Sequence, residues 1–79
     1  MRKASQEIRE ILSNNIKILR KEFGLSQENF AYKCGLHRTY IGVIERGERN
    51  VTLSSLETIA FALEIDVPSL LSVNKKENK

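Results

Sequence analysis

Apolar residues recur at helical spacing along most of the chain. Spacings of three and four residues place side chains on one face of a helix. In the first third of the sequence the positions that share such a face are Ile8, Ile11, Leu12, Ile16, Leu19 and Phe23. Charged residues such as Lys17 and Lys21 are left for the opposite side. The pattern predicts a long first helix that begins near Ile8 and ends at Gly24.

The central stretch, residues 26–50, predicts two short helices with a tight turn between them. Ser26 is expected to cap the first, because its hydroxyl can accept from a free backbone N–H. Gly35 is expected to end it, since glycine tolerates the left-handed conformation found at helix ends. The second helix is expected from His37 or Arg38 to Gly47. Its inward positions are predicted to be Ile41, Val43 and Ile44.

The last third predicts two more helices. Leu56, Ile59, Ala60 and Leu63 repeat at helical spacing, and Thr52 or Ser54 can cap that run. Pro68 suits the first turn of a final short helix, expected to hold Ser69, Leu70, Leu71 and Val73. The sequence therefore predicts an all-α fold, a compact five-helix domain over residues 8–73. Residues 1–7 are predicted to be a flexible N-terminus and residues 74–79 a disordered tail.

Composition agrees with one small, folded domain. The chain has 79 residues, 41% of them hydrophobic, with four Gly and one Pro. At this size a single core is just sufficient, and an oligomer interface would add useful burial. No stretch is long and apolar enough to span a bilayer, and the N-terminus runs directly into charged residues. These features favour a cytoplasmic protein without membrane contact.

Positive charge is concentrated in the part that holds the two short helices. Residues 1–50 carry ten Lys and Arg against six Asp and Glu, whereas residues 51–74 carry three acids and no base. A polyanion partner requires this kind of distribution, although basic faces are often only solvated.

Catalysis and metal binding are not expected. The chain has one cysteine, Cys34, and one histidine, His37, and the turn separates them. Cys34 is expected to be a small helix residue facing inward, with a redox switch as the alternative. We therefore expect no enzyme activity, no metal, no cofactor and no small-molecule ligand.

Several punctuating residues of the central stretch agree with a known family. LSQENFA at 25–31, Gly35 and IERGERN at 44–50 resemble the helix-turn-helix of the lambda-repressor-like (Cro and Xre-type) regulators. Within that family the chain looks most like the controller proteins of restriction–modification systems. They carry a similar Arg-Thr-Tyr-Ile, here 38–41, and a similar Arg-Asn, here 49–50. Two residues depart from the family: Gly42 stands where a serine is frequent, and His37 where Ser or Asp would cap the helix.

The second short helix offers hydrogen-bond donors at the end that could enter the major groove of DNA. Arg38 can reach O6 and N7 of guanine, and Thr39 offers a hydroxyl and a methyl group. Tyr40 can touch base methyls or phosphate, and Gly42 is expected on the same outer face. These four residues are the predicted base-reading set. The alternatives are a solvated surface arginine for Arg38 and packing at the edge of the core for Tyr40.

A second set is predicted to contact the DNA backbone. Gln27 lies in the first turn of its helix, where free N–H groups face an approaching phosphate, and it resembles the family's phosphate-gripping glutamine. His37 is expected to cap its helix or to contact phosphate. Arg46, Arg49 and Asn50 follow the recognition helix and should fix its register on the duplex. For Arg49 a solvated loop residue is the alternative.

The resemblance also implies one structural ion pair. In the family, an arginine at the position of Arg20 pairs with the glutamate of the IERG motif, here Glu45. Such a pair would join the first helix to the recognition helix, and removing one partner would leave a buried charge alone.

The C-terminal apolar residues are predicted to form a two-fold dimer interface: Ile65, Val67, Leu70, Leu71 and Val73. The alternative is that Leu70 and Leu71 cover the core of their own monomer. The resemblance implies a homodimeric transcriptional regulator on a near-palindromic DNA operator, controlling restriction–modification genes including its own, with RNA polymerase as a candidate further partner. The rival hypothesis is an antitoxin-like or other protein-binding helix-turn-helix module.

Overall fold

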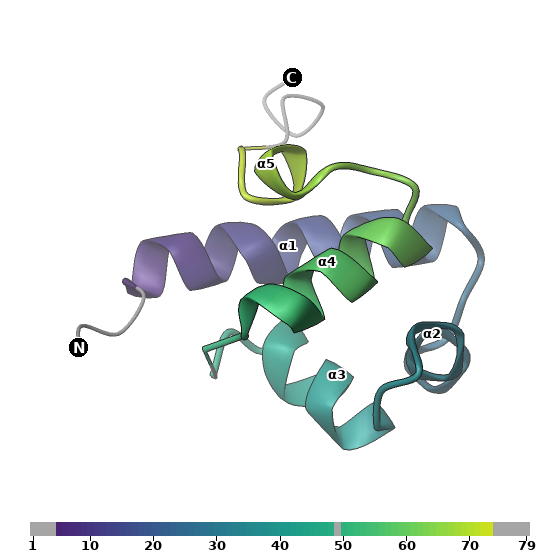
Figure 1. The fold of residues 1–79 in the computed structure, drawn as a ribbon. Helices are drawn as coiled ribbons and strands as arrows, with labels where there is room; N and C mark the ends of the chain where they lie inside the picture. Colours follow the sequence, from purple (N-terminus) through teal and green to yellow (C-terminus); the bar gives the residue numbers. More distant parts are fainter. Residues whose placement is uncertain (1–4, 49, 74–79) are drawn as a thin grey trace.

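The computed structural model describes residues 5–48 and 50–73, and in these ranges it contains five helices and no strand. The helices are α1 Gln6–Glu22, α2 Gln27–Cys34, α3 Arg38–Glu45, α4 Leu53–Ala62 and α5 Val67–Leu70. In Figure 1 the long α1 runs behind α4, with α5 on one side of it and α3 on the other. The predicted all-α, five-helix fold is confirmed.

Each helix begins at a side chain that accepts from a backbone N–H of the first turn. These capping residues are Ser5, Ser26, His37, Thr52 and Asp66. The caps at Ser26 and Thr52 were expected from the sequence. Ser5 was not, and because it caps α1 the helix begins two residues before its predicted start. Gln6 and Glu7, assigned to the flexible N-terminus, are therefore helical. The other residues predicted to be flexible, 1–4 and 74–79, lie outside the described residues.

One core joins all five helices. Its fully buried side chains come from every helix: Ile16, Phe30, Ile41, Ile44, Ile59 and Leu70. The recognition helix α3 contacts α1 on one side and α2 on the other, and α4 contacts α2 and α5. The helix-turn-helix pair α2–α3 therefore packs against α1 and α4.

Two apolar residues lie where the sequence pattern did not place them. Phe23 was expected to face inward, but it follows the last residue of α1 and is 38% exposed. The ammonium group of Lys33 lies 4.7 Å from the centre of its ring, a cation–π contact. Val73 was expected inside the last helix, but α5 ends at Leu70 and Val73 is 59% exposed.

The assignment of Leu70 to a dimer interface is wrong. Leu70 is completely buried within the single chain, so a second copy cannot contact its side chain. It packs into the core because α5 contacts both α1 and α4. The alternative held open for Leu70, covering its own core, is the correct one.

A buried asparagine, which the sequence analysis did not single out, fixes the C-terminal segment. Asn15 in α1 is 5% exposed. Its side-chain amide donates to the carbonyl oxygen of Leu70 at 2.8 Å and to that of Ser72 at 2.6 Å. The first bond satisfies a carbonyl group at the end of α5 that has no partner within the helix, and the second satisfies a carbonyl group just beyond the helix. No helix in the described ranges is long and apolar enough to cross a membrane.

Candidate nucleic-acid interface

The turn between α2 and α3 has the conformation that its glycine predicts. Gly35 is left-handed, with φ of 70°, and its N–H donates to the carbonyl of Tyr32. The N–H of Leu36 donates to the carbonyl of Ala31. Both bonds satisfy carbonyl groups at the end of α2. The turn is therefore closed by its own backbone, and α3 starts directly after it.

His37 caps the recognition helix, which is one of the two roles expected for it. Its Nδ1 accepts from the N–H of Thr39 at 3.0 Å. An imidazole nitrogen that accepts carries no hydrogen, so in the neutral ring Nε2 must carry it. His37 is exposed, and its Nε2–H remains a donor at the outer end of α3.

A polar hollow of about 620 Å³ lies between α2 and α3. Five predicted DNA contacts line it together: Gln27, Arg38, Thr39, Gly42 and Arg46. All of them except Gly42 are exposed. We call this region the α2–α3 hollow. Arg38 Nη1 lies 3.8 Å from Glu28 Oε2 across it, and both side chains are well exposed. The structure therefore brings most of the predicted contacts to one surface.

Gly42 lines the α2–α3 hollow, on the outer face where it was predicted, but it is itself buried there. A Cβ at this position would lie 3.4 Å from Nη1 of Arg46 and 3.9 Å from Oε1 of Gln27, which are ordinary contact distances. Its contribution to base reading stays a prediction. Tyr40 is half-buried and packs against the core. Its environment is therefore that of the alternative, packing at the edge of the core.

Arg20 and Glu45, which the resemblance pairs, form a bidentate ion pair. Arg20 Nε lies 2.7 Å from Glu45 Oε2, and Arg20 Nη2 lies 3.0 Å from Oε1. The two residues are only 8% and 3% exposed. Arg20 Nη1 also donates to the carbonyl of Leu25 at 2.8 Å, and Gln27 Nε2 donates to Glu45 Oε1 at 2.9 Å. One buried carboxylate thus joins α1, α2 and α3.

The end of α3 carries two arginine contacts that differ in kind. Arg46 is exposed, and its Nε lies 3.1 Å from Glu48 Oε2. Arg9 in α1, which sequence reasoning did not assign to the site, donates from Nε to the carbonyl of Gly47 at 3.1 Å. Asn50 is exposed and lines a separate small hollow with Leu12 and Leu71. The prediction for Arg49 lies outside the described residues.

Sequence reasoning also missed the acids Glu28 and Glu48 as members of this surface. Their charge gave no signal, because acids in a helix's first turn and in polar loops are ordinary. Only the folded structure shows that each acid lies beside an arginine.

Cys34 is a core thiol, in agreement with the expectation that it faces inward. It is 8% exposed, and burial raises its pKa from 9.0 to about 11, against a smaller opposite effect of Lys33. A thiol that stays protonated is a poor nucleophile. No group of three or more His, Cys, Asp or Glu residues in the described ranges could hold a metal ion.

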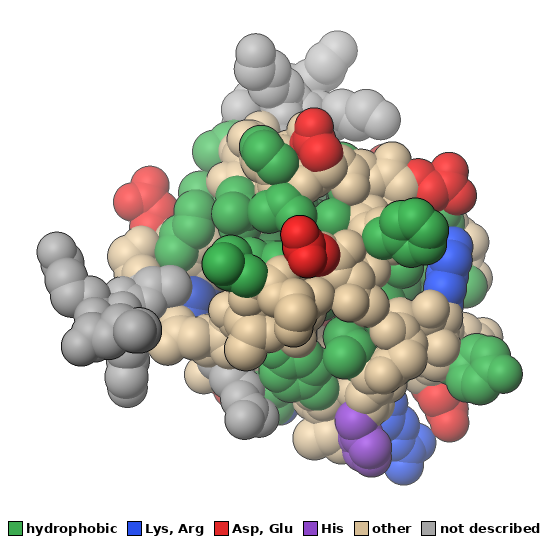
Figure 2. Space-filling model, in the orientation of Figure 1, with side chains coloured by type: hydrophobic (Ala, Val, Ile, Leu, Met, Phe, Trp, Pro, Cys, Tyr) green, Lys and Arg blue, Asp and Glu red, His purple; other side chains and the backbone are tan. Residues whose placement is uncertain are grey.

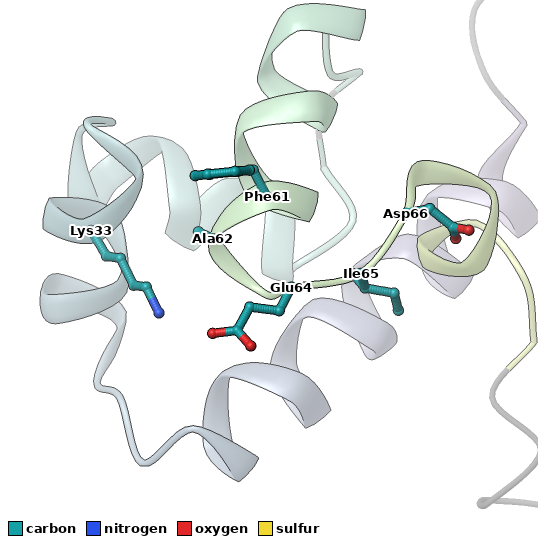
Figure 3. A pocket seen from close by; sticks show the side chains of 6 residues that line it. All are labelled: Lys33, Phe61, Ala62, Glu64, Ile65 and Asp66. Atoms are coloured by element: carbon teal, nitrogen blue, oxygen red, sulfur yellow. The ribbon is translucent and has the colours of Figure 1, made fainter.

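A second hollow lies on another side of the molecule, between α2 and the α4–α5 connection (Figure 3). Lys33, Phe61 and Glu64 point toward it, whereas the carboxylate of Asp66 points away. Asp66 Oδ1 accepts from the N–H of Ser69 at 2.9 Å, and hydrogen bonds with Ser69 lower the pKa of this exposed carboxyl group. Asp66 therefore serves as a helix cap.

Apolar side chains gather over α4 and α5 in the view of Figure 2, with acidic side chains among them. Of the predicted interface residues, Ile65, Val67 and Leu71 are half-buried and Val73 is exposed. We call these four residues the C-terminal patch. Its acidic surroundings contrast with the arginines of the α2–α3 hollow.

Known proteins resemble the chain along most of its length. The sequence pattern of the helix-turn-helix family HTH_3 matches residues 16–70. The control protein C.SmaI of Serratia marcescens is 51% identical over 73 residues, 92% of this chain and 87% of that protein. The restriction–modification controller protein C.AhdI of Aeromonas hydrophila has a TM-score of 0.76 and 38% identity, covering 82% of this chain and 94% of that one.

A further solved structure is that of the controller protein C.Esp1396I as a tetramer in complex with its natural 35 base-pair operator. It has a TM-score of 0.72 and 44% identity, covering 80% of this chain and 83% of that one. The family match spans α2 and α3 and more than half of the sequence. This chain therefore belongs to the helix-turn-helix family and is a homologue of the controller proteins of restriction–modification systems.

Proposed function

We propose that the protein is a sequence-specific DNA-binding transcriptional regulator that acts as a homodimer on a near-palindromic operator. The observation that carries this proposal is the exposed first turn of α3. Arg38 and Thr39 lie there beside Gln27 at the start of α2, and the buried carboxylate of Glu45 joins α3 to Arg20 of α1 and to Gln27 of α2. Donors on such a turn are suited to reading base edges in a major groove.

The exposed residues divide into two roles. Arg38 can donate both arms of its guanidinium to a guanine, and Thr39 can contact an adjacent base. Gln27, His37 and Arg46 surround them and are placed to meet phosphates, His37 through its Nε2–H. The proposed role of Tyr40 is limited to its exposed edge, and Arg49 and Asn50 are proposed as further backbone contacts.

The C-terminal patch is the proposed dimer interface. A domain of this size gains stability by burying exposed apolar area against a second copy. A two-fold interface there would place two recognition helices about 34 Å apart, one turn of DNA. The operator-bound tetramer of C.Esp1396I shows that a homologous controller protein assembles on its DNA.

The genes under control are proposed from the relatives. Because the homologues are control proteins of restriction–modification systems, the operator is expected upstream of a restriction gene or of the regulator's own gene. RNA polymerase is the partner that regulation at such a site would involve.

Arg38→Ala tests base readout. A gel shift compares the duplex that the wild type selects from a random pool with a scrambled duplex, at one stated salt concentration. We expect Arg38→Ala to cost roughly 1–3 kcal/mol on the selected duplex and to flatten the preference. Arg49→Ala should weaken both duplexes alike and lower the salt slope by about one. A wild type that prefers no duplex would instead support a protein-binding module.

Leu71→Glu tests the dimer. We expect a folded monomer by sedimentation at micromolar concentration, with operator binding lost where the wild type still binds, because one half-site gives too little affinity. Tyr32→Glu is the matched control for the oligomeric state alone and should remain a dimer, since Tyr32 lies on α2 and is 89% exposed. Its DNA affinity is not compared, because Tyr32 lines a hollow with His37 and Arg38. A wild-type monomer that binds one half-site as tightly as the whole operator would contradict the dimer.

A further inference from the structure

We propose that Glu28 is a specificity-determining residue of the DNA interface, because its carboxylate competes with DNA for the guanidinium of Arg38. The inference rests on the proposed function. Glu28 does not read a base itself in this scheme. It sets how much affinity Arg38 contributes to the cognate complex, in which the ion pair must break.

The observation is the ion pair across the α2–α3 hollow. Arg38 Nη1 lies 3.8 Å from Glu28 Oε2, and the side chains are 68% and 73% exposed. Both line the α2–α3 hollow, as Gln27 and Arg46 also do. The carboxylate therefore lies on the surface that would face DNA, next to the residue with the greatest capacity to read a base.

A simpler role for Glu28 is to complement the dipole of α2, since it is the second residue of that helix. Glu7 has the same position in α1, after the same Ser and Gln. Within residues 5–48 and 50–73 no ion pair joins Glu7 to an arginine, whereas Glu28 faces Arg38. The two residues thus separate the helix effect from the effect on Arg38.

The strength of the pair suits a competitor. An exposed ion pair is weak and is screened by salt. A bidentate contact with guanine is stronger, so the cognate base removes Arg38 from Glu28. Non-specific binding consists almost entirely of phosphate contacts. There Arg38 can stay paired with Glu28, whereas the specific complex must give up the pair, and repulsion between Glu28 and phosphate acts on both complexes alike. Glu28 therefore disfavours the specific complex more than the non-specific one.

The test measures affinity for the selected duplex and for a scrambled duplex over a series of salt concentrations. We expect Glu28→Gln to tighten both complexes, the selected one roughly two- to fivefold more, the range of a weak exposed pair. The salt slope on scrambled DNA should steepen by about one, because Arg38 gains a phosphate. Specificity should rise in proportion.

Two variants serve as controls. Glu48→Gln removes the same charge from the same surface, but its partner Arg46 is a proposed phosphate contact, so both duplexes should gain equally. Glu7→Gln changes the equivalent position of α1 and should leave the ratio unchanged.

The double variant Glu28→Gln with Arg38→Ala decides the mechanism. Without Arg38, the change at Glu28 should no longer alter the ratio of the two affinities. A ratio that still rises in the double variant, or a ratio that falls or stays unchanged in Glu28→Gln while the wild type prefers its duplex, would overturn the proposal and leave the DNA-binding function standing. A wild type without preference would overturn both.

Discussion

The same three residues, Ser-Gln-Glu, begin both α1 and α2, at 5–7 and at 26–28. At both places the serine caps the helix. Ser5 Oγ accepts from the N–H of Ile8 at 3.2 Å, and Ser26 Oγ accepts from the N–H of Asn29 at 3.0 Å. The local outcome is the same because capping depends only on the residues of the first turn.

The two copies differ in what lies opposite them. Gln6 Nε2 donates to Glu10 Oε2 at 3.0 Å, one turn further along the same exposed helix. Gln27 Nε2 donates at 2.9 Å to the buried carboxylate of Glu45 in α3. The same amide thus supports a helix surface in one place and the recognition helix in the other. Position in the fold decides whether a short motif becomes part of the proposed site.

The Arg20–Glu45 ion pair should give the largest effect. Gln27 at the start of α2 donates to this pair, whereas Gln6 at the start of α1 donates only to Glu10. Glu45 is the last residue of α3, where the helix dipole disfavours a negative charge. We expect Arg20→Ala and Glu45→Ala each to lower the free energy of unfolding by about 3–5 kcal/mol, since each leaves a buried charge alone. Urea denaturation measures this.

The double variant is the control for that prediction. It removes both charges, so it should lose much less than the sum of the two single changes. Strict additivity would show that the two side chains do not interact in solution. Either single change should also weaken DNA binding, although neither residue is a proposed DNA contact.

The sequence predicted the helices well because their signals are local. Ser26, Gly35 and Thr52 act through their own backbone neighbours, and the spacing of apolar residues marks the inward face of each helix. The errors came at ends and edges. Leu70 and Val73 lie three residues apart in one apolar run, yet one is fully buried and the other 59% exposed. The length of α5 decides between them, and no local residue specifies it.

The site was predictable only in part, for the same reason. Arg38, Thr39 and Gln27 could be found because their positions follow from helix starts. Gly42 lines the hollow on the predicted face, but its burial there could not be predicted, since burial depends on neighbouring elements. Arg9 and Glu28 could not be assigned, because each depends on a partner in another element.

Gln27→Ala and Gln6→Ala form the next comparison. Gln27 donates to a buried carboxylate, and a hydrogen bond to a charged group contributes about 1.5–3 kcal/mol. We expect a loss near the lower end of that range, because Gln27 itself is exposed. Gln6→Ala removes only an exposed contact within one helix and should cost less than about 0.5 kcal/mol. Urea denaturation of both variants checks the difference, and equal losses would mean that the bond to Glu45 adds nothing beyond its helix.

The smallest effects are expected at the caps themselves. Ser26→Ala should cost about 1 kcal/mol, the usual loss for a helix cap. Ser5→Ala should cost a few tenths, because α1 has 17 residues and can fray at its first turn while its buried residues stay in place. α2 has eight residues, so fraying there would free Gln27 from Glu45. In Ser26→Gly the loss should shrink to a few tenths, since glycine is tolerated at this position. Equal losses in Ser5→Ala and Ser26→Ala would show that each first turn acts alone, and that the start of α2 is not coupled to the recognition helix.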